Sequence, residues 1–166
     1  MAEKKSLPAR RQVPETDTWN LSPLFRSDKA WGRACAEAEG LYPKIAAFRG
    51  RLGRSPKLLR ECCDFEIGLS RLLDKIGVYA HLRHSEDVAD PACQGMLARF
   101  TFIATRAGEA ASYIAPEIQA IPKDKMGACL KSPLLAPYKF NLEKLLRFKP
   151  HILSEKEERL LAMQGE

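Results

Sequence analysis

The residues that come nearest to a metal site in type and spacing are His81 and His84, in the stretch HLRH. Residues three apart on a helix share one face, so this pair could present two nitrogen ligands together. Zinc sites of the HExxH kind, however, need histidines four apart and a glutamate between them that activates water. This pair has neither feature, and Glu86 and Asp87, which could add oxygen ligands, fall in a predicted turn. We therefore interpret His81 and His84 as helix-end residues near solvent, and His151 as a loop residue.

The serines give no nucleophile arrangement, because most of them stand where a helix is predicted to begin. Helix capping explains Ser27, Ser55, Ser132 and Ser154. The ten glycines fall in neither GxGxxG nor GxxxxGK spacing, and the sequence has no GxSxG elbow. Carboxylate pairs such as Glu61/Asp64 and Glu155/Glu158 occupy charged helix faces, which solvation explains. The sequence thus predicts no catalytic residue, no cofactor-binding residue and no metal ligand in this chain.

The five cysteines show no spacing typical of a zinc or redox site. They are Cys35, Cys62, Cys63, Cys93 and Cys129, an odd number with no CxxC pair. We interpret them as reduced thiols used as small hydrophobic residues.

Positive charge is concentrated in the first part of the chain. Residues 1–60 hold 13 Lys and Arg against 6 Asp and Glu, whereas residues 61–166 hold 14 against 15. The excess gathers at a predicted turn, in Arg49, Arg51, Arg54, Lys57 and Arg60. Such a cluster is either a solvated turn or a site for an anion or nucleic acid, and the scarcity of aromatic residues near it favours the first.

Composition places the chain among globular proteins, with 45% hydrophobic and 29% charged residues. No stretch approaches the roughly 18–20 consecutive apolar residues that cross a bilayer. The first residues are basic but are not followed by an apolar run, and Pro8 and Pro14 oppose an amphipathic leader helix. We expect a cytoplasmic protein, not associated with membranes, with a flexible N-terminal arm over residues 1–17.

Three long helices are predicted from apolar residues that recur at alternating steps of three and four. The first begins at Ser27-Asp28, continues as one kinked helix through Pro43, and ends at Gly50 or Gly53. The second begins at Ser55-Pro56 and ends near His84, and the third begins at Asp90-Pro91 and ends or kinks at Pro116. The expected stripes are Trp31, Ala34, Ala38, Leu41, Ile45, Phe48 and Leu52; Leu58, Cys62, Phe65, Leu69, Leu72, Ile76 and Tyr79; and Met96, Phe100, Ile103, Ala107, Ala110 and Ile114. The average step of 3.5 residues and the short connections predict long antiparallel helical hairpins in an all-α fold.

Prolines divide the remainder into shorter helices. Pro122, Pro133, Pro137 and Pro150 mark the divisions, and residues 134–148 read as one helix. A last helix opens with the capping box Ser154-Glu155-Lys156-Glu157. A helix of about ten residues is marginal by itself, so we expect residues 151–166 to start a further helix that leads into a longer protein.

Several stretches resemble the oligoendopeptidase F family, zinc metallopeptidases of the thimet oligopeptidase group. They are residues 18–25 (TWNLSPLF), 27–31 (SDKAW), 48–52 (FRGRL), 79–87 (YAHLRHSED) and 152–158 (ILSEKEE). Each is weak alone, but together they run in order along nearly the whole chain. Asn20 is a mild departure, because the family typically has an acidic residue there.

The resemblance implies a mostly helical protein with a deep channel and a C-terminal zinc site made by an HExxH helix and a downstream glutamate. None of those residues exists here, so the resemblance implies a non-catalytic N-terminal portion, inactive alone, whose zinc and catalytic domain lie in a missing C-terminal part. Residues 18–150 would form a helical N-terminal domain in the wall of a channel for oligopeptide substrates. Exposed apolar surface is expected where the catalytic part docks, and it could also allow self-association.

Two alternatives remain open at this point. The chain could be a free-standing helical module that presents a groove or its basic turn to a protein partner. Nucleic-acid binding through residues 49–60 is the weaker alternative, and we expect no nucleic-acid partner.

Overall fold

The computed structural model describes residues 10–149, and every regular element in that range is a helix. The predicted all-α fold is confirmed, with long helices followed by short ones. The α-helices are α1 (Asp28–Leu41), α2 (Pro56–Glu86), α3 (Pro91–Ala111), α4 (Ile114–Ala120), α5 (Lys123–Leu130) and α6 (Lys139–Arg147). Helices of the 3-10 type cover Arg10–Gln12, Glu15–Asp17, Tyr42–Phe48 and Pro133–Tyr138. Residues 150–166, with His151 and the predicted capping box at Ser154, lie outside the described part of the chain.

The three long helices begin where the sequence predicts, because a side chain caps each first turn. Ser27 Oγ accepts a hydrogen bond from the backbone N–H of Ala30 at 3.2 Å. Ser55 Oγ accepts one from Leu58 at 3.2 Å, and Asp90 Oδ1 accepts one from Ala92 at 2.8 Å. Each cap satisfies a backbone donor that the helix itself leaves without a partner.

The described residues form two compact units. Unit 1 combines residues 10–47 with 65–111, and unit 2 combines residues 48–64 with 112–149. Our sequence-based limits of 1–17, 18–150 and 151–166 stay predictions. Within the described residues no helix is long and apolar enough to cross a membrane.

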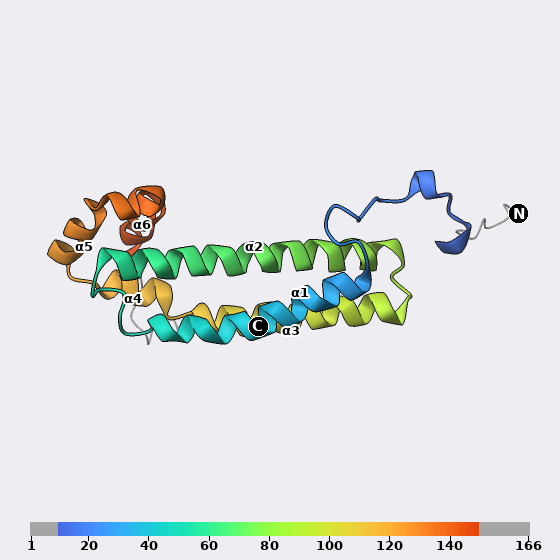
Figure 1. Ribbon diagram of the computed structural model, residues 1–166, viewed down its shortest axis with the longest axis horizontal. Helices are drawn as coiled ribbons and strands as arrows, with labels where there is room; N and C mark the ends of the chain where they lie inside the picture. Colours follow the sequence, from blue (N-terminus) through green and yellow to red (C-terminus); the bar gives the residue numbers. More distant parts are fainter. Residues whose placement is uncertain (1–9, 150–166) are drawn as a thin grey trace, which may run out of the picture. The chain divides into compact units, whose positions relative to one another are not determined.

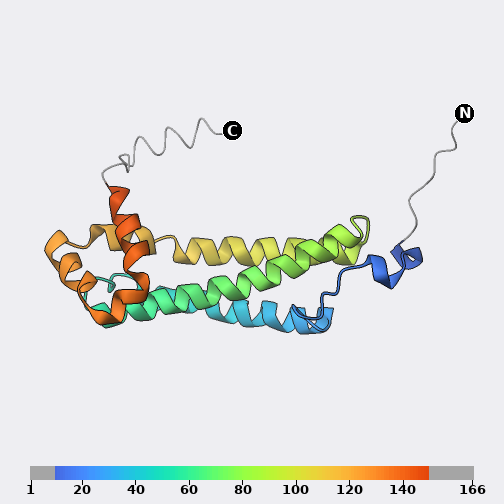
Figure 2. The same ribbon diagram turned by 90° about the horizontal axis from the view of Figure 1, so that it is seen from above.

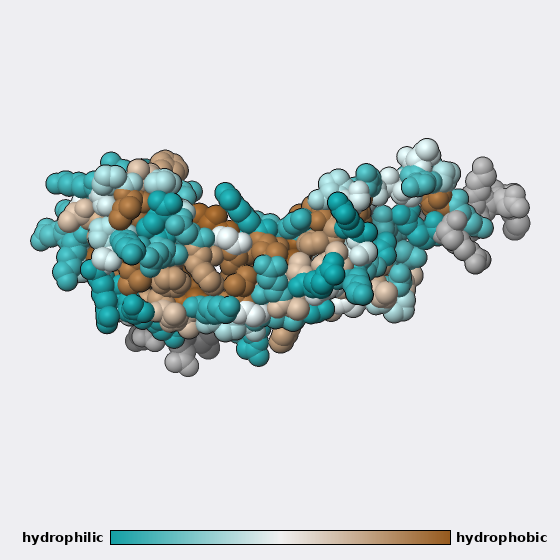
Figure 3. Space-filling model, in the orientation of Figure 1, coloured by the Kyte–Doolittle hydropathy of each residue, from teal (hydrophilic) through white to brown (hydrophobic). Residues whose placement is uncertain are grey.

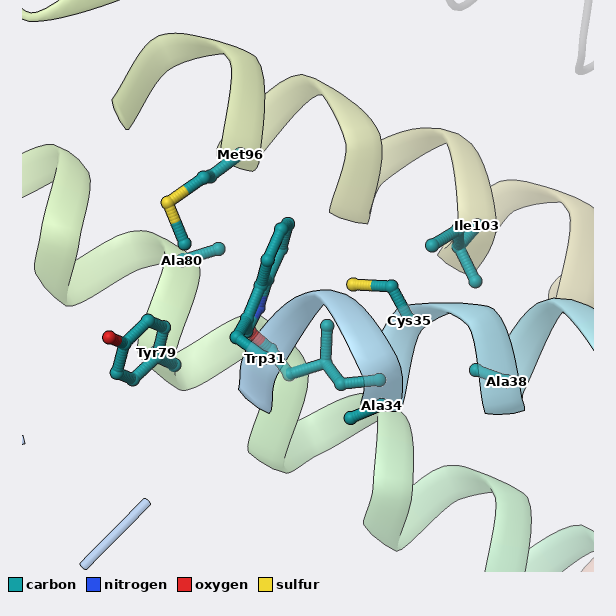
Figure 4. Close-up of a cluster of buried hydrophobic side chains, with 9 residues drawn as sticks. Trp31, Ala34, Cys35, Ala38, Tyr79, Ala80, Met96 and Ile103 are labelled. Carbon is teal, nitrogen blue, oxygen red and sulfur yellow. The ribbon is translucent and has the colours of Figure 1, made fainter. Parts of the chain in front are cut away.

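Unit 1 is built on α1, α3 and the larger part of α2, which lie side by side (Figures 1 and 2). Its core cluster includes seven of the predicted stripe residues, which come from all three long helices, and Figure 4 shows core side chains of the three helices converging. Trp31 lies at the centre, 4% exposed, and its indole Nε1 donates a hydrogen bond to the backbone oxygen of Ile76 at 3.0 Å. The core residues are Trp31, Ala34, Cys35, Ala38, Ile76, Tyr79, Ala80, Met96 and Ile103.

Two features of unit 1 show how closely its helices approach. Gly77 of α2 faces the ring of Phe100 on α3, so that an added Cβ would lie 2.5 Å from the ring tip. The start of α1 lies beside the end of α2, since Tyr79 contacts Asp28. α1 and α3 therefore both run antiparallel to α2, as the predicted hairpins require.

The expectation of one kinked helix through Pro43 is wrong. The α-helix ends at Leu41, and residues Tyr42–Phe48 continue as a 3-10 helix. Pro43 has no N–H to donate to the preceding turn, and its ring opposes the α-helical path there. The apolar phase nevertheless persists, because Ile45 and Leu52 are fully buried.

Unit 2 packs the short helices around the start of α2. The prediction that residues 134–148 form one helix is wrong, because Pro133–Tyr138 is a 3-10 helix and α6 begins only at Lys139. Pro137 accounts for the change, since an α-helix would need its missing N–H. The third helix ends earlier than predicted: α3 stops at Ala111, and Pro116, which was expected to end or kink it, falls in the first turn of α4, where its missing N–H costs nothing. The buried residues include Leu52, Leu59, Ile114, Ile118, Ile121, Met126, Leu135 and Leu142.

Candidate interaction surfaces

A polar network in unit 1 fastens α1 to the last turns of α2. The Tyr79 hydroxyl donates to Asp28 Oδ1 at 2.7 Å, and Arg83 donates to Glu86 at 2.7 Å and to Asp28 at 3.3 Å. Arg10 adds an ion pair with Glu86 at 2.8 Å. The network holds two elements together through these contacts, although Arg83 Nε is buried without a hydrogen-bond partner among the described residues.

The pKa values of Tyr79 and Arg83 in this network are both raised, for different reasons. Burial raises the pKa of Tyr79 to about 12, and the hydrogen bond to Asp28 acts in the same direction. Burial opposes the charged form of Arg83, but the hydrogen bond to Glu86 and the charge of Asp28 outweigh it and raise the pKa of Arg83. Tyr79 is therefore neutral and Arg83 charged at any physiological pH.

His81 and His84 lie at the end of α2, as predicted. His81 is exposed, and its ring meets Phe100 edge to face with centroids 5.8 Å apart. Glu86, the carboxylate that could have completed a ligand set, is paired with Arg10 and Arg83. Over residues 10–149 no three His, Cys, Asp or Glu side chains are grouped to hold a metal ion.

The basic residues near the start of α2 are partly used inside unit 2. The Arg49 guanidinium lies 4.7 Å from the ring centre of Tyr113. Arg60 donates to Asp64 at 2.7 Å and to the backbone oxygen of Leu134 at 2.9 Å. At least two members of the cluster thus bind α2 and its preceding turn to the rest of the unit.

Asp64 links that cluster to the 3-10 helix Pro133–Tyr138. Its carboxylate accepts hydrogen bonds from the Tyr138 hydroxyl and from Arg60. Those two bonds, the one from Tyr138 first, hold the pKa of Asp64 below its usual value. The same bond raises the pKa of Tyr138, so the pair stays ionised at Asp64 and neutral at Tyr138.

Glu117 holds the turn that precedes α2, a role that the sequence gave no reason to expect. Its two carboxylate oxygens accept hydrogen bonds from the backbone N–H groups of Gly50 and Leu52, at 2.7 and 2.8 Å. Gly50 has a φ of +72°, which suits glycine, and Leu52 is fully buried. The carboxylate therefore fixes a sharp turn that carries a core side chain.

Large apolar side chains are exposed in both units. In unit 1 they are Trp19, Val78, Val88 and Phe102, and in unit 2 they are Leu134, Phe140 and Phe148, each between 47% and 68% exposed. Figure 3 shows apolar side chains open to view over the middle of α2. Surface of this kind is typical of an interface with another part of a protein.

Two pockets accompany these surfaces. One, of about 530 Å³, lies in unit 1 between the first described residues and the end of α2, with Trp19 and Val88 in its wall. Its charged residues include Arg10 and Glu86, which pair with each other. The other, of about 620 Å³, is more apolar and lies in unit 2 between α5 and α6.

Comparison with known proteins identifies what this arrangement is similar to. A family described as Oligopeptidase F matches residues 117–166. Oligopeptidase PepF of Bacillus subtilis (strain 168) is 34% identical over 170 residues, which cover 100% of this chain and 25% of PepF. Group B oligopeptidase PepB of Streptococcus agalactiae serotype III (strain NEM316) is 32% identical, over 95% of this chain and 26% of PepB. The chain is similar to the N-terminal region of oligoendopeptidase F.

The fold agrees with that likeness. A crystal structure of a Chlamydophila abortus protein superposes with a TM-score of 0.85 at 28% identity, covering 96% of this chain and 27% of that one. The structure of oligoendopeptidase-F from Enterococcus faecium gives a TM-score of 0.69 at 26% identity, over 84% of this chain and 28% of the other. The chain thus spans about a quarter of the length of the peptidases it matches, and the family resemblance drawn from its motifs is confirmed.

Proposed function

We propose that this chain acts as the non-catalytic N-terminal helical part of a cytoplasmic peptidase of the oligoendopeptidase F kind, which cleaves short peptides. One observation carries the proposal: the likeness extends over the whole chain yet over only about a quarter of PepF. The hydrolytic chemistry then belongs to the other three quarters. Residues 18–150 are the proposed domain, preceded by the proposed arm of residues 1–17.

The residues of this chain do not fit a catalytic zinc ion. The only closely spaced histidines of the sequence, His81 and His84, lack the four-residue spacing and the intervening glutamate of an HExxH helix. The nearby carboxylate of Glu86 is neutralised by two arginines. We therefore assign no step of peptide hydrolysis to these side chains, and we place the zinc of the family in the proposed catalytic part.

The proposed role is structural: the helices form part of the wall of the substrate channel and carry the surface on which the catalytic part docks. Exposed Val78 and Phe102 supply apolar contact area in unit 1. The network around Asp28 and Arg83 keeps α1 and α2 fixed with respect to each other, as a wall requires. Self-association through the same apolar surface is expected only when the catalytic part is absent.

An alternative function is a free-standing module that binds a partner through its basic turn. The contacts of the arginines support it less well than the role in a peptidase. Such a module would present its arginines to a partner. Arg49 instead stacks on Tyr113, and Arg60 is bound to Asp64 and to the Leu134 backbone. Contacts within the chain therefore explain the presence of Arg49 and Arg60 in the basic cluster, and no acidic partner is needed to account for these two residues.

A chimaera tests the proposal. This chain would replace the matching N-terminal quarter of Bacillus subtilis PepF, and the cleavage of a quenched fluorescent oligopeptide would be measured beside PepF from which that quarter is deleted. We expect the chimaera to cleave the peptide and the deletion variant to be inactive. A chimaera that binds zinc but is no more active than the deletion variant would contradict the proposed role.

The chain alone provides the matching control. It should hold no zinc after purification and should hydrolyse no peptide. One equivalent of zinc per chain, together with peptidase activity that persists through repurification, would show that the chain is itself an enzyme and would refute a non-catalytic role.

A further inference from the structure

The pocket between α5 and α6 in unit 2 combines an apolar wall with positive charge. Its volume is about 620 Å³, and the apolar part of its wall consists of Ile121, Met126, Leu130 and Leu146. Ile121 and Met126 are nearly buried, whereas Leu130 and Leu146 are partly exposed. Pockets that bind small molecules have volumes of this order and are lined mainly by hydrophobic side chains with a few polar groups. The pocket therefore suits a small ligand with an apolar body.

The charge in the pocket wall has one sign. Among the described residues, the charged side chains that line the pocket are those of Lys123 and Lys149, which are both exposed and form no ion pair within residues 10–149. Asp124, which follows Lys123 in the first turn of α5, does not line the pocket. Lys123 is also the first residue of α5, where the helix dipole adds to the positive potential. The ligand should therefore carry a negative charge at one end.

Gly127 of α5 leaves part of the pocket open. It lines the pocket, and a Cβ added to it would meet no described atom within 4 Å. Its φ is not positive, so the backbone at this position does not need a glycine. Glycine inside a helix is less stable than alanine, yet neither the backbone nor crowding by a described neighbour explains its presence here. The missing side chain instead provides room for a ligand.

An aliphatic chain fits this wall better than a peptide does. Each peptide residue brings a backbone N–H and C=O, which are costly to bury without hydrogen bonds. The side chains of the wall are apolar apart from the two lysines, and lysine can donate hydrogen bonds but cannot accept one from an N–H. An unbranched hydrocarbon chain has no such groups to satisfy.

We infer that this pocket binds a medium-chain aliphatic carboxylate, of the fatty acid class. The hydrocarbon chain packs against the apolar wall and over Gly127, and the carboxylate lies at Lys123 and Lys149. The inference does not depend on the proposed function.

Calorimetric titration of the full chain with decanoate, at low salt and below the concentration at which micelles form, tests the inference. One decanoate should bind per chain. Octanoate is two methylenes shorter and should bind about tenfold more weakly, because each buried methylene contributes about threefold to fourfold in affinity. Decylammonium has the same apolar chain with the opposite charge and should bind at least about tenfold more weakly than decanoate. Absence of decanoate binding, or equal binding of decylammonium, would overturn the inference.

The lysines are tested by a pair of double variants that change the net charge equally. Lys123→Gln/Lys149→Gln should weaken decanoate binding about tenfold and remove the preference over decylammonium, since two exposed charge contacts account for a factor of this order. Lys125→Gln/Lys131→Gln, at exposed lysines of the same unit that do not line the pocket, should leave the affinity unchanged. An equal loss in both double variants would mean that only the overall charge attracts decanoate and would overturn the site.

A substitution that fills the pocket completes the test. Gly127→Leu should weaken decanoate binding at least about tenfold while the circular dichroism of the helices is retained, because leucine is a better helix former than glycine. Decanoate binding that survives Gly127→Leu in a folded chain would overturn the inference. Should that variant unfold unit 2, the exposed lysine variants still decide. Tighter binding of acetyl-trileucine, a peptide with a free carboxylate, than of decanoate would overturn the choice of an aliphatic chain.

Discussion

Gly77 offers a sharp test of the packing between α2 and α3. Replacing a glycine inside a helix by alanine normally stabilises the helix by about 1 kcal/mol, because glycine has more backbone freedom to lose. At Gly77, however, the new Cβ would lie 2.5 Å from Phe100 Cζ and 2.8 Å from Cε2. Overpacking of this kind costs about 1–3 kcal/mol. The clash should therefore reverse the sign, with Gly77→Ala lowering the free energy of unfolding by about 1 kcal/mol.

Gly68 in the same helix is the matched control. A Cβ added there meets nothing within 4 Å, so Gly68→Ala should raise the free energy of unfolding by about 1 kcal/mol. The two variants should then differ by about 2 kcal/mol in urea unfolding followed by far-ultraviolet circular dichroism. If Gly77→Ala stabilised the chain as much as Gly68→Ala, the close approach of α2 and α3 would be refuted.

A double-mutant cycle assigns the effect to the ring. Phe100→Leu removes the ring tip that meets the new Cβ, so adding Gly77→Ala to it should cost less than in the unaltered chain. The coupling between the two substitutions should reach about 1 kcal/mol. Independent effects, adding within about 0.3–0.5 kcal/mol, would mean that the cost of Gly77→Ala has another origin.

Three further predictions concern polar and reactive groups. Glu117→Gln should destabilise the chain by about 1–3 kcal/mol in urea, because a charged acceptor of two backbone N–H groups is weakened, whereas Glu61→Gln on an exposed face should cost less than about 0.5 kcal/mol. The proton held by Tyr79 contributes stability that is complete below about pH 10, its unfolded pKa, and is lost as pH rises toward the folded value of about 12. The stability difference between the unaltered chain and Tyr79→Phe should therefore shrink over that window, and a constant difference would contradict the raised pKa of Tyr79. Burial raises the pKa of Cys35 to about 11, so a thiol reagent at neutral pH should modify it only as fast as the chain opens, and rapid modification in the folded chain would show that it is accessible.

The helices that could be predicted from the sequence are those whose starts and buried faces are marked by residues close to one another along the chain. Ser55-Pro56 and Asp90-Pro91 mark helix starts by capping and by the fixed proline φ, and the structure begins α2 and α3 at those prolines. The apolar period was equally informative, since Ile76 and Ile103 are fully buried. Both signals depend on neighbours within a few residues.

Helix type at a proline could not be predicted from the same signals. Pro43 keeps the apolar phase whether the chain kinks as an α-helix or tightens into a 3-10 helix, because the buried positions on either side fit both paths. Pro137 poses the same ambiguity. Ile45 and Leu135 are both fully buried within the 3-10 helices, so the apolar pattern alone does not distinguish the two helix types.

The polar contacts that stabilise each unit could not be predicted from the sequence, because their partners are far apart along the chain. Glu117 reads as an ordinary helix carboxylate, yet its acceptor role involves N–H groups 65 and 67 residues away. Asp28 reads as part of a helix cap, but it also binds Tyr79 and Arg83. The absence of a catalytic motif, by contrast, is a property of the sequence alone, which is why the family resemblance and that absence together led to the proposed function.

The burial of Trp31 has a practical consequence for spectroscopy. The sequence contains two tryptophans, Trp19 and Trp31, and both belong to unit 1. Trp31 is 4% exposed and Trp19 is 53% exposed, so one indole should emit at short wavelength and resist acrylamide, while the other should emit at long wavelength and be quenched. Intrinsic fluorescence therefore reports on unit 1 alone, whereas circular dichroism reports on the helices of both units. Comparing the two signals during denaturation would reveal whether the units unfold in one cooperative step or in succession.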